Sequence, residues 1–255
     1  MAAQAFIPFM TKGVDVSSDP RAGAIVCIGD SITEGLGSTK DRNLRYPDDL
    51  SARLAQSPLK DYSVVNLGIA GNQILHSPSA NPASNEALLL RFDRDALHKS
   101  GVKYVILLEG INDILHADGN RPDQPPIAPD QGRVITDAYT ALAKKAHAAG
   151  VKIYIGTLTP SSQFRGMNGV AGALRHNVNA WIRGPESNVF DGVIDFDQAV
   201  AVPNRIPEVY KSGLNSPDGL HPNDDGYAAM AGARKVISIL MPRLRVAAPE
   251  QVRWI

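Results

Sequence analysis

Cysteine is almost absent from this sequence, since Cys27 is the single one among 255 residues. One cysteine excludes an intrachain disulfide and any metal site built from several thiolates. The histidines other than His221 show no spacing typical of metal ligands, and they are His76, His98, His116, His147 and His176. We therefore expect neither a metal nor another cofactor.

The sequence also lacks an excess of either charge. Its 26 basic residues balance its 26 acidic residues. A chain without a basic surplus has no electrostatic footprint for nucleic acid or for an acidic membrane surface. We expect a small, roughly neutral partner instead, and no pattern in the sequence indicates an oligomeric state.

Long apolar runs are missing as well. No uncharged stretch approaches the ~20 residues that are needed to span a bilayer, so we expect no membrane insertion. The apolar stretch 5–10 is short, contains Pro8 and has no basic residue ahead of it, unlike a signal peptide. We expect a soluble protein, cytoplasmic as the sequence stands, or a mature secreted form if a leader has been removed.

What the sequence does contain is an alternation of strand-like and helix-like segments. Short apolar runs at 24–28, 63–67, 104–108, 151–157 and 192–196 alternate with helical patterns at 47–56, 85–98, 133–149, 171–181 and 227–240. This order predicts an α/β fold, in which a five-stranded parallel sheet is covered by helices on both faces. With 44% hydrophobic residues, we expect one domain over 24–241, an N-terminal arm over 1–23 and a C-terminal tail over 242–255.

The first apolar run ends in Gly29-Asp30-Ser31, and Ser31 is the candidate nucleophile. In parallel sheets, chemistry collects beyond the carboxyl ends of the strands, where the next helix begins. Ser31 has a structural interpretation too, because serine is a good N-cap. The nucleophile elbow Gly-x-Ser-x-Gly is incomplete, since Thr33 occupies the place of its second glycine.

A candidate base lies before the last helix, in Asp218-Gly219-Leu220-His221-Pro222. A serine hydroxyl needs an adjacent base at neutral pH, and imidazole can serve as one. Asp218 could accept a hydrogen bond from the other ring nitrogen and fix its tautomer. Taken alone, a loop histidine beside an aspartate is more often structural.

Two further blocks follow the second and third apolar runs. Gly71 comes after the second, and Gly110-Ile111-Asn112-Asp113 comes after the third. Alone, Gly71 would be a turn glycine and Asn112 an Asx-turn residue. The four blocks in this order resemble the SGNH, or GDSL-type, hydrolase superfamily over about 24–241. The segments 45–48 and 108–113 are similar to bacterial esterase domains grouped with xylan-degrading enzymes.

The resemblance implies a flavodoxin-like, three-layer α/β/α fold and a serine esterase. Ser31 would attack the ester carbonyl, His221 would act as the base, and Asp218 would orient the imidazole. The oxyanion hole would consist of the backbone N–H groups of Ser31 and Gly71 and the side-chain amide of Asn112. Asp30, Asn72 and Asp113 would support these groups without taking part in the chemistry.

The substrate class is open on the sequence alone. Long polar connections follow the third, fourth and fifth strands, and residues expected to rim the cleft form hydrogen bonds readily: Asn43, Arg45, Asn120, Gln163, Arg165 and Asn168. These favour a small-molecule ester with a short acyl group, such as an acetylated carbohydrate. A lysophospholipase or thioesterase of the same superfamily is the alternative, and a non-catalytic binding domain on this fold is a more remote one.

Overall fold

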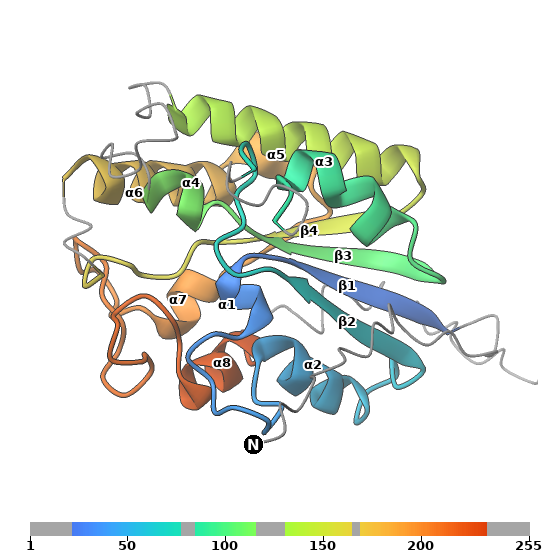
Figure 1. Ribbon diagram of the computed structural model, residues 1–255, viewed down its shortest axis with the longest axis horizontal. Helices are drawn as coiled ribbons and strands as arrows, with labels where there is room; N and C mark the ends of the chain where they lie inside the picture. Colours follow the sequence, from blue (N-terminus) through green and yellow to red (C-terminus); the bar gives the residue numbers. More distant parts are fainter. Residues whose placement is uncertain (1–21, 78–84, 116–130, 165–168, 234–255) are drawn as a thin grey trace, which may run out of the picture.

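The computed structural model describes residues 22–77, 85–115, 131–164 and 169–233. Its centre is a sheet of five strands: β1 (Gly23–Gly29), β2 (Tyr62–Gly68), β3 (Val102–Leu108), β4 (Lys152–Gly156) and β5 (Gly192–Ile194). The strand order is β2-β1-β3-β4-β5, and every neighbouring pair is parallel. The prediction of a five-stranded parallel sheet is therefore confirmed (Figure 1).

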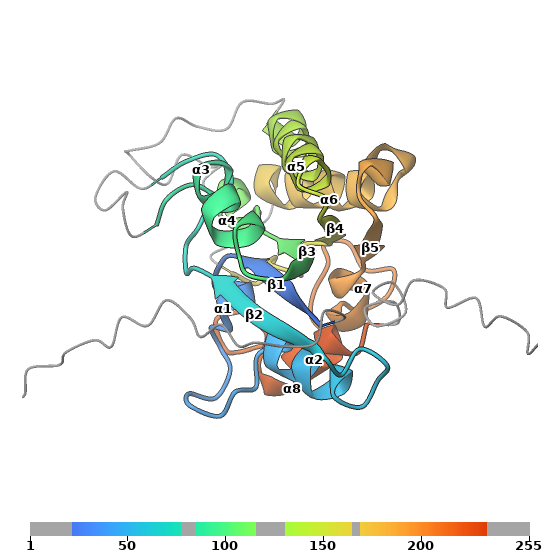
Figure 2. The ribbon, with the colours of Figure 1, turned by 90° about the vertical axis from the view of Figure 1, so that its right-hand side faces the viewer.

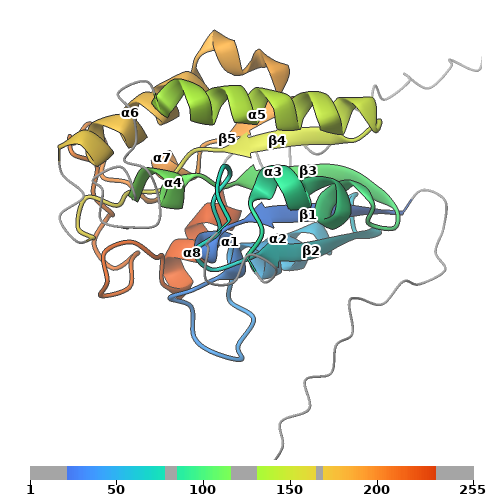
Figure 3. The same ribbon diagram turned by 45° about the horizontal axis from the view of Figure 1, so that its top comes forward.

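Helices cover both faces of this sheet. One face carries α1 (Ser31–Glu34), α2 (Tyr46–Leu54), α7 (Phe196–Val200) and α8 (Asp224–Ala231). The other carries α3 (Leu88–Phe92), α4 (Ile111–Leu115), α5 (Gln131–Ala148) and α6 (Val170–Arg183). Figure 2 shows the resulting three layers, and Figure 3 shows α5 and α6 side by side on their face. The three-layer α/β/α fold is thus confirmed.

The burial of each strand follows its place in the sheet. From Ala24 to Gly29, every residue of the inner strand β1 is buried, whereas no residue of the edge strand β2 is fully buried. A strand covered on both faces needs apolar side chains at successive positions, which is why β1 and β3 appear as continuous apolar runs in the sequence. The carboxyl ends of β1, β2 and β3 consequently lie together at one edge of a rigid core.

The structure differs from the sequence prediction at several boundaries. The fifth strand ends at Ile194 and not at residue 196, because Asp195 caps α7 by accepting a hydrogen bond from the Gln198 N–H at 3.0 Å. Phe196 then packs against Tyr46, with ring centroids 5.1 Å apart. The short helices α4 and α7 were not predicted.

The predicted helix 85–98 begins only at Leu88 and continues beyond Phe92 as a π-helical turn, Asp93–Leu97. A 3-10 turn, Pro185–Val189, precedes β5. The tail 242–255 and nearly all of the arm 1–23 lie outside the described residues, as does the last predicted helix beyond residue 233.

Candidate active site

Ser31 lies at the turn from β1 into α1, where it is 5% exposed. The cap of this helix is Asp30, whose Oδ1 accepts a hydrogen bond from the Ile32 N–H at 2.8 Å. Ser31 is the first helical residue, so the interpretation of Ser31 as a mere cap is excluded. Gly29 allows the turn to approach β3 closely, because a Cβ added there would lie 2.0 Å from the carbonyl oxygen of Leu108.

His221 reaches Ser31 from the loop before α8. The Ser31 Oγ and the His221 Nε2 are 2.9 Å apart, although 190 residues separate them in the sequence. The His221 Nδ1 lies 2.5 Å from the Asp218 Oδ2. When the Nδ1–H donates to the ionised carboxylate, Nε2 is free to accept the hydroxyl proton of Ser31. The structure thus brings the three predicted residues into one hydrogen-bonded chain.

Asp218 is held in its ionised form. Partial burial would raise the pKa of its carboxyl, but hydrogen bonds from His221, Leu220 and Ser216 outweigh this effect and hold the pKa well below its usual range. Its Oδ1 accepts from the backbone N–H groups of Leu220 at 2.9 Å and His221 at 3.0 Å. The same contacts fold the loop so that the imidazole is presented to the serine.

Contacts of the loop after α1 with α8 and with the segment before it hold Ser31 and His221 in place. The Tyr227 hydroxyl donates to the carbonyl oxygen of Leu36 at 2.6 Å, and Asp224 accepts from the N–H of Thr39 at 2.7 Å. Gly37 adopts a φ of +94°, and a Cβ there would lie 2.5 Å from the Pro222 carbonyl oxygen. The loop after α1 therefore packs directly on the segment that carries His221.

The predicted oxyanion donors lie at the ends of three neighbouring strands. Gly71, with a φ of +73°, follows β2, and Asn112 follows β3. The Asn112 Nδ2 donates one hydrogen to the carbonyl oxygen of Asn72 at 2.9 Å. Within the described ranges, the backbone N–H groups of Ser31 and Gly71 have no hydrogen-bond partner. Two backbone donors and the second amide hydrogen of Asn112 are therefore available to a ligand.

The three residues expected to support the site are all buried. Asp113 accepts from the backbone N–H groups of Ile74 at 2.9 Å and Leu75 at 3.1 Å, which ties the turn after β3 to the loop after β2. Asn72 joins the same loop to Asn112 and to Asn85. Burial raises the pKa of both Asp30 and Asp113 to about 7.

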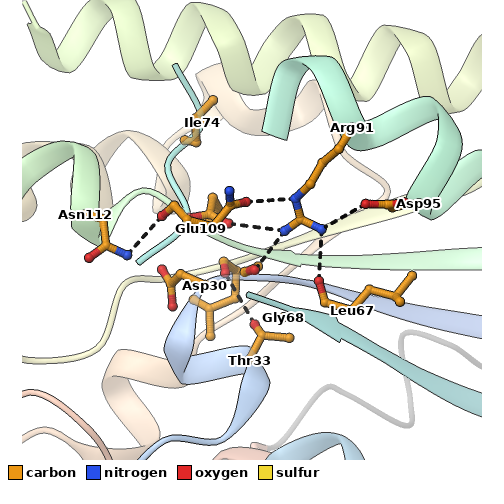
Figure 4. A network of polar contacts seen from close by, with 12 residues as sticks. Asp30, Thr33, Leu67, Gly68, Ile74, Arg91, Asp95, Glu109 and Asn112 are labelled. Atoms are coloured by element: carbon orange, nitrogen blue, oxygen red, sulfur yellow. Dashed lines mark hydrogen bonds and ion pairs between the residues drawn. The ribbon is translucent and has the colours of Figure 1, made fainter. Parts of the chain in front are cut away.

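Arg91 was not identified from the sequence, and its buried guanidinium lies between α3 and these strand ends (Figure 4). A signal for it existed in the helical pattern. Leu88 and Phe92 place the apolar face of α3 toward the core, and Arg91 occupies that same face, where an apolar residue is expected. A charged residue at such a position indicates a specific buried partner.

Nothing in the described part of the chain forms a metal site of three or more His, Cys, Asp or Glu side chains. Its helices are all too short or too polar to cross a membrane. One hollow, of about 860 Å³, lies between α6, β5 and α8, and another, of about 450 Å³, lies between α2 and α8. Neither is lined by Ser31, Asp218 or His221.

Several solved structures share the fold of this chain. An acetyl xylan esterase, AlAXEase, has a TM-score of 0.61 at 23% identity, covering 86% of this chain and 100% of its own. The acetylxylan esterase Axe2 from Geobacillus stearothermophilus has a TM-score of 0.61 at 18% identity, covering 86% and 95%. A GDSL-like lipase from Bacteroides thetaiotaomicron has a TM-score of 0.59 at 20% identity, covering 85% and 87%.

No curated protein sequence matches the chain. The family model of the GDSL-like Lipase/Acylhydrolase family, in contrast, matches residues 27–229. This match spans β1 to α8 and includes each member of the Ser31, Asp218 and His221 chain, as well as Gly71 and Asn112. The resemblance found in the four sequence blocks is thereby confirmed, and the chain belongs to the GDSL-like lipase and acylhydrolase family and is a carboxylic ester hydrolase.

Proposed function

We propose that this protein is a serine esterase that hydrolyses short-chain esters, with acetyl esters of carbohydrates or similarly polar alcohols as its substrates. The observation that carries the proposal is the chain of contacts from the Ser31 Oγ to the His221 Nε2 (2.9 Å) and from the His221 Nδ1 to the Asp218 Oδ2 (2.5 Å). Nucleophilic catalysis by serine requires a base within hydrogen-bond reach and a third group that orients the base.

In the first half-reaction, the Ser31 Oγ attacks the ester carbonyl carbon while His221 takes the hydroxyl proton. The carbonyl electron pair moves to the oxygen, which becomes an oxyanion. Asp218, ionised and hydrogen-bonded to Nδ1, stabilises the imidazolium. Collapse of the tetrahedral intermediate breaks the bond to the alcohol, which leaves with the proton from His221, and Ser31 stays acylated.

In the second half-reaction, water replaces the alcohol. His221 takes a proton from the water as the water oxygen attacks the acyl carbon of the acyl-enzyme. Collapse of this second tetrahedral intermediate breaks the bond to the Ser31 Oγ, which takes the proton back from His221 while the carboxylic acid leaves. In both half-reactions the oxyanion accepts hydrogen bonds from the Ser31 and Gly71 N–H groups and from the Asn112 amide. These donors are fixed before the reaction begins, so their orientation costs nothing at the moment when charge develops.

The polar rim supports a polar alcohol as leaving group. Gln163 lies beside the histidine loop, since a Cβ added at Gly219 would lie 2.7 Å from the Gln163 Cβ. Asn43 is exposed in the loop that follows α1. Arg45 is the N-cap residue of α2, and its Nη1 lies 3.5 Å from the Asp48 Oδ2. The other rim residues predicted, Asn120, Arg165 and Asn168, lie outside the described residues.

One further observation favours a short acyl group. Two of the structural neighbours are acetyl xylan esterases. These neighbours share the fold at low identity, so they support acetyl as the acyl group by analogy.

The test is a series of p-nitrophenyl esters from acetate to laurate, run beside acetylated xylo-oligosaccharides and sugar acetates. We expect kcat/KM to be highest for acetate, to fall with acyl length, and acetate to be released from the sugars. The Ser31→Ala variant serves as the control for hydrolysis that does not depend on the site. Specificity that rises to octanoate or beyond, without acetate release, would favour a lysophospholipase or thioesterase.

A further inference from the structure

Arg91 is a buried cation that connects the strand ends around the catalytic site. It belongs to α3 and is 1% exposed. Its Nη2 donates to the carbonyl oxygen of Gly29 at 2.9 Å, and its Nη1 donates to that of Leu67 at 3.1 Å. Its Nε donates to the Asn72 Oδ1 at 2.8 Å. Figure 4 shows the guanidinium spread between the ends of these strands.

Each acceptor belongs to a segment that carries one proposed oxyanion donor. Gly29 ends β1, two residues before Ser31. Leu67 lies near the end of β2, and Asn72 directly follows Gly71. The Asn72 carbonyl oxygen in turn accepts from the Asn112 Nδ2 at 2.9 Å. One planar group thus connects, directly or through Asn72, to all three donors.

Two carboxyl groups lie near the guanidinium of Arg91. Its Nη2 lies 3.9 Å from the Glu109 Oε2, and its Nη1 lies 3.5 Å from the Asp95 Oδ2. Glu109 is itself 1% exposed and lies at the end of β3. Burial of a guanidinium carries a desolvation penalty, and a well-packed apolar side chain is often at least as stabilising in such a place. Core packing alone therefore does not account for an arginine at this position.

A guanidinium differs from other cations in its fixed fork of five N–H donors. This geometry allows one side chain to hold two carbonyl oxygens and an amide oxygen at defined angles. Lysine carries the same charge on a flexible stem and cannot reproduce the planar arrangement. The three contacts of Arg91 use this property, since they arise from three different nitrogens.

We propose that Arg91 is a positioning residue for the oxyanion hole, which fixes the backbone turns before Ser31 and beside Gly71 and, through Asn72, the amide of Asn112. The inference rests on the proposed serine esterase mechanism. Displacement of catalytic groups by ~1 Å is enough to lower a rate about 100-fold. Because the oxyanion exists only after attack, loss of this alignment lowers kcat more than it changes KM.

The test compares Arg91→Lys with Arg94→Lys on p-nitrophenyl acetate. Arg94 is a matched control, because it is three residues away, its side chain is 61% exposed, and it also pairs with Asp95. We expect Arg91→Lys to lower kcat about tenfold or more, with KM nearly unchanged, while Arg94→Lys retains wild-type values. Thermal unfolding curves establish that both variants are folded at the assay temperature.

A double variant separates positioning from a general loss of order. The double variant combines Arg91→Lys with Asn112→Ala. If Arg91 acts through the oxyanion hole, the fold-decrease in kcat of the double variant is smaller than the product of the two single fold-decreases, because one of the positioned donors is already gone. Losses that multiply fully would overturn the inference, and so would an Arg91→Lys variant with wild-type kcat.

Should Arg91→Lys fail to fold, Asn72→Ala interrupts the same connection from its other side. A lower kcat at constant KM then supports the inference, and an unchanged kcat overturns it. The activity of the wild-type protein shows which proposal fails. If the wild type hydrolyses esters and Arg91→Lys has the same kcat, only the role of Arg91 is overturned. If the wild type hydrolyses no ester, the proposed function is overturned as well.

Discussion

Asn112 donates its side-chain amide to the main-chain carbonyl oxygen of Asn72, with the two atoms 2.9 Å apart. Because a carbonyl oxygen can only accept, this contact fixes which end of the amide carries the nitrogen and which way it points. The second hydrogen on the same nitrogen has no acceptor within the described residues, and in the proposed mechanism it faces the substrate. A residue of the loop after β2 thereby orients a donor that belongs to the turn after β3.

This relationship predicts the effect of Asn112→Ala. We expect kcat to fall about 100-fold or more, with a smaller change in KM, because one donor aimed at the developing oxyanion is lost. Steady-state kinetics on p-nitrophenyl acetate measure both constants, and Asn112→Asp is the matched variant that keeps the size but removes the donor. A change in KM alone would assign Asn112 to substrate binding or to the turn.

Ser31 is predicted to become acylated during turnover. A fluorophosphonate probe should label the wild-type protein with one equivalent, and Ser31→Ala should remove both the labelling and the esterase activity. Ser57→Ala is the matched control and should leave the labelling unchanged. The Ser57 hydroxyl donates to the Leu54 carbonyl oxygen at 2.9 Å, at the end of α2. Equal labelling of wild type and Ser31→Ala would rule out Ser31 as the nucleophile.

Asp218→Asn should leave the protein folded but lower kcat by about 10³- to 10⁴-fold, since an amide that donates to Nδ1 stabilises the wrong imidazole tautomer. Wild-type activity should also fall as the pH drops, because a protonated imidazole cannot accept the serine proton. Measurements of kcat/KM against pH test both expectations. Wild-type turnover by Asp218→Asn, combined with an inactive His221→Ala, would indicate a Ser-His dyad with another orienting group.

The buried carboxyl group of Asp30 should make the free energy of unfolding depend on pH. Burial raises the pKa of its carboxyl from 3.8 to about 7 in the folded protein, so the folded state binds more protons than the unfolded state between these values. The free energy of unfolding contributed by this group therefore falls as the pH rises through this window, on the order of 1 kcal/mol per pH unit.

Asp30→Asn is the matched variant, since an asparagine can still cap α1 by accepting from the Ile32 N–H. Denaturant unfolding of both proteins at pH 5 and pH 8 isolates the contribution of Asp30 from that of other titrating groups. We expect wild type to lose stability relative to Asp30→Asn at the higher pH. An equal change in the free energy of unfolding of the two proteins between pH 5 and pH 8 would show that Asp30 does not titrate in this window.

Several features of the fold are determined by short stretches of sequence. The apolar runs predict the strands because a strand buried on both faces has no other composition. Each candidate catalytic block directly follows a strand or precedes the last helix, and the carboxyl ends of parallel strands necessarily meet at one edge. These patterns predict where Ser31, Gly71, Asn112 and the pair Asp218 and His221 lie, whereas their roles are implied by the resemblance to the SGNH superfamily.

Short elements were harder to predict because their boundaries depend on contacts with other parts of the chain. The end of β5 at Ile194 illustrates this: residues 192–196 have one continuous apolar pattern apart from Asp195, yet Asp195 caps a new helix. Phe196 then packs against Gly156 of β4 and Tyr46 of α2. No local pattern contains that information.

The sequence by itself determined the order of the strands, and hence the order of the blocks after them that carry the proposed chemistry. Only the tertiary structure decided that Ser31 and His221 lie 2.9 Å apart and that Arg91 reaches Gly29, Leu67 and Asn72. The physical reason is the range of the interactions. Strand and helix patterns arise from neighbours along the chain, whereas these hydrogen bonds join residues that are brought together only when the helices pack on the sheet.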